Sequence, residues 1–248
     1  MDKDYAAKYR RLEDRNWWFV ARRDMVGRLL KGTDTGARIL DVGCSGGTMI
    51  RFLLDKGFRD ITGIDVSEEA VEGCRRKGLT QVHCMDGENP DFPDGTFDEV
   101  IASDVLEHLP RDRNALESWR RLLKPGGRLI LFVPAFRFLW SKHDEVNHHF
   151  RRYHRKELLG LLKEAGFTVR RCSYWNVLLF PPIAAVRLLQ RLMRKDSAEM
   201  DQLHDISPAI NAALIGLFKI ENILLERLSM PFGVSIFVLA EKPAPPPG

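Results

Sequence analysis

The chain has 248 residues, which is enough for one α/β domain with a complete hydrophobic core. Its net charge of +4 is too small to require a nucleic-acid partner, and its composition is ordinary for a soluble globular protein. No apolar run reaches the roughly 18 residues that span a bilayer, and Met1-Asp2-Lys3-Asp4 does not begin a signal peptide. The four cysteines are scattered, without a Cys-x-x-Cys pair. We therefore expect a cytoplasmic protein without disulfides or a metal site.

Strands and helices are predicted to alternate over the first part of the chain. An amphipathic helix is expected at 17–31, where apolar side chains recur at helical spacing. Strands are then predicted at 37–42, 61–65, 81–85, 97–102 and 128–133, with helices at 47–57, 68–76 and 113–123. Such alternation predicts a parallel sheet that is covered by helices on both faces.

The pattern changes after Pro134. An irregular aromatic and basic segment is followed by a helix, two further strands and two helical patterns between those strands. The helices are predicted at 155–165, 181–193 and 207–228, and the strands at 167–174 and 233–239. We expect a single domain, 1–248, whose parts are a helical lid at 1–32, a core at 37–175 and 233–241, an insertion at 176–232 and a disordered, proline-rich tail at 242–248.

A glycine turn directly follows the first predicted strand. Residues 41–47 read Asp-Val-Gly-Cys-Ser-Gly-Gly, and glycine lets the backbone approach a ligand because it lacks Cβ and tolerates positive φ. The dinucleotide fingerprint is not met, because Ser45 stands at the middle glycine position and the third glycine is missing. Asp41 suits a ligand with a cationic group better than a pyrophosphate. The alternative is a tight strand–helix connection that binds nothing.

Acidic or small polar residues end four successive strands. They are Asp41, Asp65, Asp86-Gly87 and Ser103-Asp104. Since the carboxyl ends of parallel strands meet in one crevice, a carboxylate at Asp65 would reach the two hydroxyls of a ribose. Asp86 could accept from an adenine amino group while the next N–H donates to the ring. These strand ends predict a nucleotide-type cofactor site.

The segments 39–47, 63–65, 97–109 and 123–130 resemble the motifs of class I S-adenosylmethionine-dependent methyltransferases and follow the same order. The resemblance covers about residues 37–135 and implies S-adenosylmethionine as cofactor, with S-adenosylhomocysteine as product. It also implies that the last strand is antiparallel. The expected fold is therefore a three-layer, Rossmann-like, seven-stranded sheet with an N-terminal helical lid and a helical insertion before the last strand.

The resemblance implies roles for individual residues. Asp41 and the turn would hold the methionine part of the cofactor, and Ser103 and Asp104 would lie beneath the sulfonium. The N-terminal helix would form a lid over the cofactor, in which Trp18 packs and Arg22 reaches the methionine carboxylate. The alternative is that the two tryptophans at 17 and 18 only pin their helix to the sheet. The implied cofactor-binding residues are Trp18, Arg22, Asp41, Gly43, Cys44, Ser45, Gly46, Asp65, Val66, Asp86, Gly87, Ser103, Asp104 and His108.

The methyl acceptor is expected near residues 139–153, which follow the fifth strand. The candidate bases are His149, His148 and His143, because histidine exchanges protons near neutral pH. Arg151 and Arg152 could bind a carboxylate or phosphate. The alternative is a capping loop in which arginine pairs with Asp144 or Glu145 and the histidines are solvated. The His143-Asp144-x4-His149 spacing admits a metal site, but no geometry supports one, so no metal ligand is predicted.

Residues 103–106 lack the Asn/Asp-Pro-Pro-aromatic signature of N-methyltransferases, which favours an oxygen or carbon acceptor. Residues 17–23 and 149–153 resemble elements of bacterial methyltransferases, many of which serve the making of sugars, glycolipids or secondary metabolites. The resemblance implies methyl transfer to a hydroxyl of a sugar, a glycolipid or a secondary metabolite. The acceptor is expected to be a small or amphiphilic acidic molecule, and it could be linked to a lipid. Two other classes remain open. A nucleic-acid methyltransferase is supported only by the basic run 151–156, and the other is a cofactor-binding regulatory protein with little catalysis.

The insertion at 176–232 allows several interpretations. Its first helix has a broad apolar side and a row of Arg187, Arg191 and Arg194. Such a helix could make peripheral contact with an anionic membrane, form an oligomer interface or cover a greasy acceptor pocket. Ordinary core packing with a solvated arginine edge is the simplest alternative.

Overall fold

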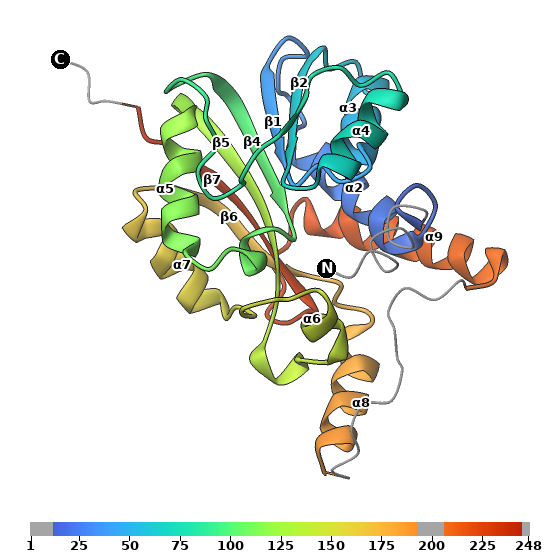
Figure 1. The fold of residues 1–248 in the computed structure, drawn as a ribbon. Coiled ribbons are helices and arrows are strands. Elements are labelled where there is room, and N and C mark those ends of the chain that lie inside the picture. The colour runs from blue at the N-terminus through green and yellow to red at the C-terminus, as the bar shows by residue number, and fades with distance from the viewer. Residues whose placement is uncertain (1–11, 193–205, 245–248) are drawn as a thin grey trace.

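A seven-stranded sheet forms the centre of the computed structural model, which describes residues 12–192 and 206–244 (Figure 1). The strand order is β3-β2-β1-β4-β5-β7-β6, and β7 runs antiparallel to both of its neighbours. The strands are β1 (Arg38–Val42), β2 (Asp60–Asp65), β3 (Val82–Cys84), β4 (Phe97–Ser103), β5 (Leu123–Pro134), β6 (Thr168–Trp175) and β7 (Ser235–Glu241). The predicted Rossmann-like sheet with an antiparallel last strand is confirmed.

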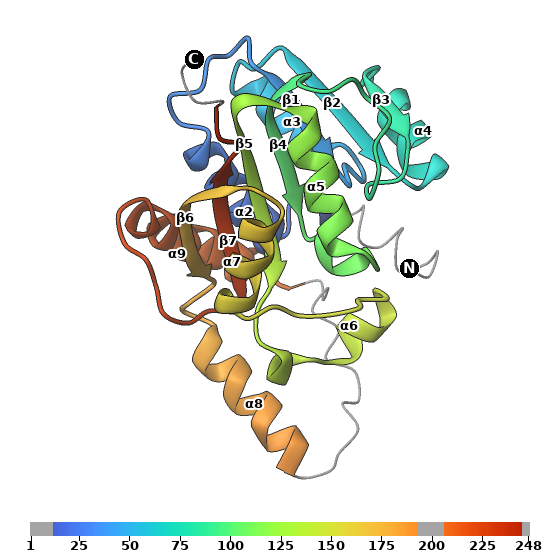
Figure 2. The ribbon, with the colours of Figure 1, turned by 90° about the vertical axis from the view of Figure 1, so that its left-hand side faces the viewer.

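Helices cover both faces of the sheet and give three layers (Figure 2). One face packs against α5 and α7, and the other packs against α2, α3, α4 and α9. The helices are α2 (Trp17–Leu29), α3 (Thr48–Asp55), α4 (Glu68–Arg76), α5 (Asp112–Leu122), α6 (Lys142–Val146), α7 (Arg155–Glu164), α8 (Phe180–Leu192) and α9 (Pro208–Leu225), with 3-10 helices η1 (Leu106–His108) and η2 (Arg137–Leu139). In both views α8 projects away from the sheet.

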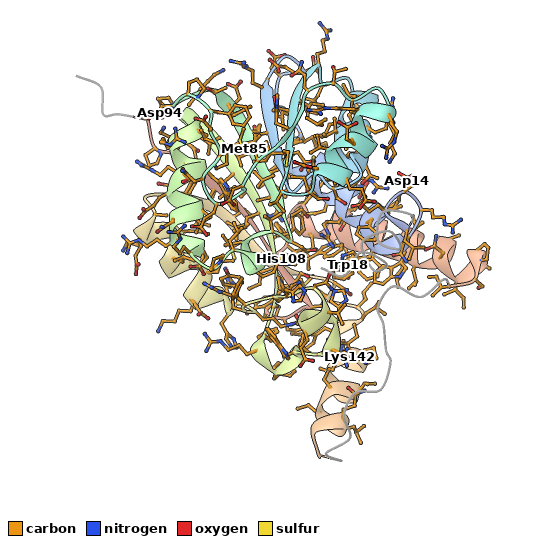
Figure 3. The ribbon with its side chains drawn as sticks, in the orientation of Figure 1. Asp14, Trp18, Met85, Asp94, His108 and Lys142 are labelled. Carbon is orange, nitrogen blue, oxygen red and sulfur yellow. The ribbon has the colours of Figure 1, made fainter. Side chains whose placement is uncertain are left out.

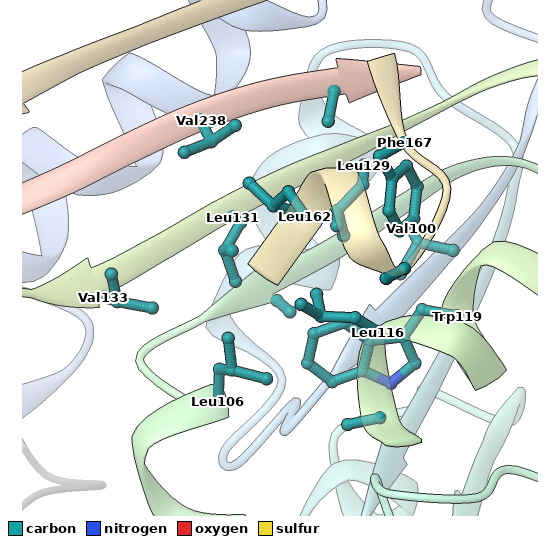
Figure 4. Close-up of a cluster of buried hydrophobic side chains, with 14 of the residues drawn as sticks. Val100, Leu106, Leu116, Trp119, Leu129, Leu131, Val133, Leu162, Phe167 and Val238 are labelled. Atoms are coloured by element: carbon teal, nitrogen blue, oxygen red, sulfur yellow. The ribbon is translucent and has the colours of Figure 1, made fainter. Parts of the chain in front are cut away.

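The alternation of side chains along β5 divides the core into two clusters. Leu129 and Leu131 belong to the cluster under α5 and α7, whereas Ile130 and Phe132 belong to the cluster on the other face. Successive strand residues point to opposite faces, so one buried apolar run serves both layers. Figure 4 shows Leu116 and Trp119 of α5 gathered with Leu129 and Leu131 of β5.

The predicted insertion is confirmed as α8 and α9, and α9 is tied to the rest of the fold. Phe218 and Leu225 of α9 are buried in the core. The Asn222 side chain donates to the Ala21 carbonyl at 2.8 Å and accepts from the Trp175 indole N–H at 2.8 Å. These buried polar contacts fix α9 against α2 and the end of β6.

Among the described residues, α9 is the one helix long and apolar enough to cross a membrane, by length and composition. The expectation that no segment reaches this length is therefore wrong. The expectation considered only uninterrupted apolar runs, and Lys219 and Glu221 interrupt the run in α9. The mean hydropathy of the helix is nevertheless 1.4. Only 22% of the helix is buried, so most of its apolar surface faces outward.

The predicted boundaries need two corrections. The strand β5 begins at Leu123, because Leu123 pairs with Phe97 before a register shift in the ladder. The sequence predicts a disordered tail from residue 242, but the Lys242 N–H donates to Gly127 and its ammonium donates to the Leu123 carbonyl at 2.6 Å. Residues 1–11 of the predicted lid, Arg194 of the predicted basic row and residues 245–248 of the tail lie outside the described residues.

Candidate active site

A cavity of about 1420 Å³ lies where the carboxyl ends of β1, β2 and β4 meet. All predicted cofactor-binding residues except Gly46 line it, as do the three candidate bases; Trp18 and His108 are labelled in Figure 3. Pockets for single small ligands span about 300–1,000 Å³. The cavity is therefore large enough for two ligands side by side.

The glycine turn is packed against the rest of the cavity wall. Gly43 has φ 72°, and a Cβ at this position would lie 2.6 Å from Cγ2 of Val105. Ser45, at the position where the related motif has its middle glycine, also adopts a positive φ of 47°. Its N–H donates to Oδ2 of Asp65 at 2.9 Å, which joins the turn to the end of β2.

Asp41 is the buried acid beneath this turn. Its side chain is 3% exposed, and its Oδ2 has no hydrogen-bond partner among the described residues. Burial raises the pKa of Asp41 well above its usual range, and the neighbouring Glu13 and Asp65 raise it further. A ligand ammonium would provide the missing partner and favour the ionised carboxylate. The glycine cradle and this carboxylate fit the methionine part of S-adenosylmethionine.

The other cofactor contacts are predicted at the ends of β2 and β3. Asp65 accepts from the N–H groups of Ser45 and Ser67, each at 2.9 Å. Each carboxylate oxygen can accept a second hydrogen bond, so two positions remain for ribose hydroxyls. Val66 is 77% exposed on the cavity wall, which suits contact with an adenine ring. Asp86 also lines the cavity and accepts from the N–H of Glu88.

The paired tryptophans fix α2 to the sheet layer. Trp17 stacks on Phe218 with centroids 4.8 Å apart, and Trp18 meets Trp175 edge-on at 5.0 Å. Trp18 also lines the cavity, so packing and a contact with the cofactor are compatible. Arg22 donates to the Ser103 hydroxyl at 3.2 Å and forms an ion pair with Asp104. The predicted contact of Arg22 with the methionine carboxylate stays a prediction.

Asp144 is the centre of a buried network after β5. It is fully buried and accepts from Arg152 Nε at 2.7 Å and from His149 Nδ1 at 2.9 Å. Burial alone would raise the pKa of Asp144, but the hydrogen bonds from His149 and Arg152 and the charge of Arg152 hold it below its usual range. A carboxylate that accepts from Nδ1 leaves Nε2 of His149 as a proton acceptor.

The other residues of the predicted acceptor segment separate into two groups. His143 and His148 line the cavity, and the His143 ring lies 6.0 Å from the His149 ring. Arg152 is held by Asp144, as the capping-loop alternative expects, but the His149 side chain is buried rather than solvated. Arg151 is not part of the cavity lining, because it pairs with Asp112 at 2.6 Å.

A family model described as a methyltransferase domain matches residues 14–171. The chain belongs to this methyltransferase family. This confirms the resemblance to class I S-adenosylmethionine-dependent methyltransferases, with S-adenosylmethionine as the donor that the family implies.

Among curated proteins, the methyltransferase is similar to ubiquinone biosynthesis O-methyltransferases. The protein of Alkalilimnicola ehrlichii is 36% identical over 117 residues, which cover 44% of this chain and 46% of the relative. That of Pseudomonas aeruginosa strain UCBPP-PA14 is 28% identical over 155 residues, which cover 54% and 66%. The chain spans about half the length of the curated relatives it matches.

Solved structures share the fold of the methyltransferase. The cyclase SpnF superposes with a TM-score of 0.60 at 24% identity and covers 91% of this chain and 81% of its own. A geranyl diphosphate methyltransferase in complex with S-adenosylmethionine has a TM-score of 0.59 at 16% identity and covers 90% and 85%. Because one of these neighbours is named a cyclase, the fold alone does not define the reaction.

Strained backbone is concentrated at the cavity of the methyltransferase. Of the described non-glycine residues with positive φ, all except Phe136 line it. They are Ser45, Asp104, His148 and Asn176, with φ between 47° and 60°. Such conformations are maintained only where the surrounding structure fixes them, and they are common at functional sites.

Among the cavity residues that sequence reasoning missed are four buried polar ones: Glu13, Glu107, Asn176 and Arg187. Glu107 stands next to the predicted His108 but was given no role, although it is fully buried. Asn176 is also fully buried, and neither end of its amide has a partner among the described residues. Arg187 was recognised only as part of a basic helix row. The one available signal was the position of Glu107 beside the predicted His108, with a leucine on each side of the pair.

Glu13 closes the glycine turn from the N-terminal segment of the methyltransferase. The Gly46 N–H donates to its Oε2 at 3.2 Å, and only 5% of the residue is exposed. Burial raises the pKa of Glu13 from 4.5 to about 7. The residue lies outside every recognised motif, 33 positions before Gly46, so no sequence pattern indicates it.

We expect the Glu13→Gln variant to lose part of the pH dependence of stability. Because the folded pKa is raised from 4.5 to about 7, the native chain binds this proton more tightly, and stability falls as pH rises through that interval. The glutamine side chain keeps an oxygen that accepts from the Gly46 N–H, but it carries no charge. Urea unfolding near pH 8 should give the variant about 1–3 kcal/mol more stability than the wild type, with little difference near pH 4.

The exposed Glu117→Gln on α5 provides the matched control, and its stability should follow the wild-type pH profile. A Glu13→Gln profile parallel to that of the wild type would show that the Glu13 carboxylate is not responsible.

Proposed function

We propose that this methyltransferase transfers a methyl group from S-adenosylmethionine to a hydroxyl of a small or amphiphilic acidic molecule. The observation that carries the proposal is one cavity that joins the acidic strand ends, Asp41 and Asp65, to the His149–Asp144 pair. The relatives named ubiquinone biosynthesis O-methyltransferases support oxygen as the acceptor atom. A sugar, a glycolipid or a secondary metabolite is the proposed class of acceptor, and the cytoplasm is the proposed compartment.

The donor supplies an activated methyl group on a sulfonium. In the transfer, the acceptor oxygen bonds to the methyl carbon while the carbon–sulfur bond breaks, and the bonding electrons stay on sulfur. The hydroxyl proton passes to Nε2 of His149, whose orientation Asp144 fixes through Nδ1. Arg152 neutralises Asp144 in the resting state, and Asp144 stabilises the imidazolium that forms. The protein acts mainly by aligning the two reactants.

An acidic group on the acceptor is supported by Arg187 of α8. Arg187 lines the cavity and is 5% exposed, and no carboxylate among the described residues lies within ion-pair distance of it. Its pKa is lowered, first by burial and then by the charge of Arg152. A buried cation of this kind gains from an anionic partner. Asn176, whose amide is unbonded among the described residues, can accept or donate to a second polar group of the acceptor.

We expect Arg187→Gln to raise the KM for the acceptor by about 10–100-fold, because one charge-assisted contact is worth about 1.5–3 kcal/mol. The affinity for S-adenosylhomocysteine should not change, since the cofactor end of the cavity is intact. Steady-state kinetics and calorimetry measure the two quantities. The exposed Arg76→Gln on α4 is the control, and equal KM values in both variants would count against an anionic acceptor group at Arg187.

A methyl-transfer screen tests the function itself. The chain is incubated with methyl-labelled S-adenosylmethionine and with separate pools of carbohydrates, polar lipids, phenolic acids and RNA. We expect O-methyl products from the small-molecule or lipid pools. Binding of S-adenosylhomocysteine without transfer to any pool would favour a regulatory protein instead. Label in RNA alone would favour a nucleic-acid methyltransferase.

We further propose that α9 contacts an anionic membrane surface, which would bring amphiphilic acceptors to the cavity. Ile210, Leu217, Ile220 and Leu224 follow one another at helical spacing and are each 40–58% exposed. Lys219 and Arg227 are exposed beside them, whereas Glu221 is buried and bonded to Val177. An apolar stripe with flanking cations suits the surface of an anionic bilayer.

Vesicle flotation checks this contact. The chain should float with vesicles containing about one third anionic lipid, and Leu217→Glu should reduce the bound fraction several-fold. The exposed Leu54→Glu on α3 is the control. A wild-type chain that stays unbound and sediments as a dimer, which Leu217→Glu dissociates, would assign the face to a second copy of the chain.

A further inference from the structure

We propose that Glu107, His108 and His149 form a binding site for one divalent transition-metal cation in the wall of the cavity. Their ligand atoms all lie within 4.8 Å of one another, which one ion can bridge. Glu107 and His108 come from η1, directly after β4, whereas His149 comes from the loop after α6. The set therefore assembles only in the folded chain, next to the expected position of the sulfonium at Ser103 and Asp104.

Glu107 is the strongest indication of a cation site. The residue is fully buried, and among the described residues no other residue donates a hydrogen bond to its carboxylate, which is left with its own backbone N–H. The nearest charges include Asp104 and Asp144, which are unfavourable, and Arg22, which Asp104 already pairs. Burying an ionised carboxylate with so few hydrogen bonds costs free energy, so the group is either protonated or bound to a cation. Because Glu107 lines the cavity, an ion can reach it.

Both histidines are held in the way that metal-binding histidines usually are. The Nδ1 of His149 bonds to Asp144 Oδ1 at 2.9 Å, and the ring of His108 bonds to the Asn147 backbone. Carboxylate and carbonyl oxygens only accept, so each ring donates there and presents a lone pair on its other nitrogen. The two rings lie 4.5 Å apart, between centroids.

Two imidazoles and one carboxylate are a donor set for Zn²⁺, Mn²⁺, Co²⁺ or Fe²⁺, and a site with three protein ligands leaves a position open for another molecule. The role of such an ion in methyl transfer rests on the proposed function. A hydroxyl of the acceptor bound at the open position would become more acidic and would lose its proton to solvent. Nε2 of His149 would then bind the ion in place of its proposed role as the base. The sequence spacing pointed only to His143, Asp144 and His149, but Asp144 is fully engaged by Arg152 and His149.

Equilibrium dialysis of the chelator-stripped full chain tests the site, with Mn²⁺, Zn²⁺ and Co²⁺ as probes and metal analysis as readout. We expect one ion per chain, and visible absorption bands of bound Co²⁺. Glu107→Gln and His149→Ala should each weaken binding at least about 10–100-fold, whereas His83→Ala, on β3 and outside the cluster, should not. Substoichiometric binding to the wild type, or wild-type affinity in both cluster variants, would overturn the proposal.

Binding of S-adenosylhomocysteine is measured for every variant and confirms that the cavity is folded. If Glu107→Gln does not fold, His149→Ala carries the test alone. Metal binding is measured without donor or acceptor, so it remains informative if the screen finds no methyl transfer. Full methyl transfer by a chain that binds none of the three ions would refute the metal site and leave the proposed function standing.

Discussion

The replacement of Asp65 by alanine is expected to weaken the binding of S-adenosylhomocysteine by about 100-fold or more. The carboxylate would lose about two charge-assisted hydrogen bonds to ribose hydroxyls, each worth about 1.5–3 kcal/mol. The structure adds a second reason, because Asp65 also accepts from the N–H groups of Ser45 and Ser67 and so fixes the glycine turn. Titration calorimetry with the purified chain measures the change.

Asp60 provides a matched control for this prediction. Asp60 begins β2 and Asp65 ends it, so the two carboxylates lie at opposite ends of this strand. Asp60 forms an ion pair with Arg38. Asp60→Ala should bind the product as the wild type does. If both variants bind it equally well, the assignment of the ribose to the tip of β2 is wrong.

The fold was predictable because its signals are local. Each strand of the first half is a short apolar run followed by turn or cap residues, and α5 places Ala115, Leu116, Trp119 and Leu122 on one buried stripe. The errors occurred where a distant partner decides the outcome. Lys242 is ordered by the start of β5, and β5 begins early because Leu123 finds Phe97 on β4.

The cofactor end of the site was predictable for a topological reason. Parallel strands end at one edge, so acids that are far apart in the sequence, such as Asp41 and Asp86, must approach one another. The acceptor end follows no such rule. Glu107 and His149 are brought together by the path of the loop after β5, and Arg187 arrives on a helix beyond the sheet. Glu13 reaches the turn from a segment without any motif.

The largest expected effect on chemistry concerns His149. His149→Ala should lower kcat by about 10²–10⁴-fold, because no base would then take the proton of the substrate hydroxyl in the transition state. The affinity for S-adenosylhomocysteine should be unchanged. Asp144→Asn should also lower kcat, since the Nδ1–H of His149 would lose its carboxylate partner. The acceptor found in the screen serves as substrate, and His83→Ala is the control. Wild-type turnover in His149→Ala would remove this histidine from the reaction.

A loss of turnover in His149→Ala follows whether the imidazole takes the proton or holds a cation, so a second measurement must separate the two roles. If His149 is the base, the chelator-stripped enzyme keeps its activity, and Glu107→Gln is less damaging than His149→Ala. If His149 is a ligand, stripping abolishes turnover, Mn²⁺ or Zn²⁺ restores it, and Glu107→Gln is as damaging as His149→Ala. Glu107 decides between the two roles, because its carboxylate has no part in proton transfer to His149 but is required to hold the ion.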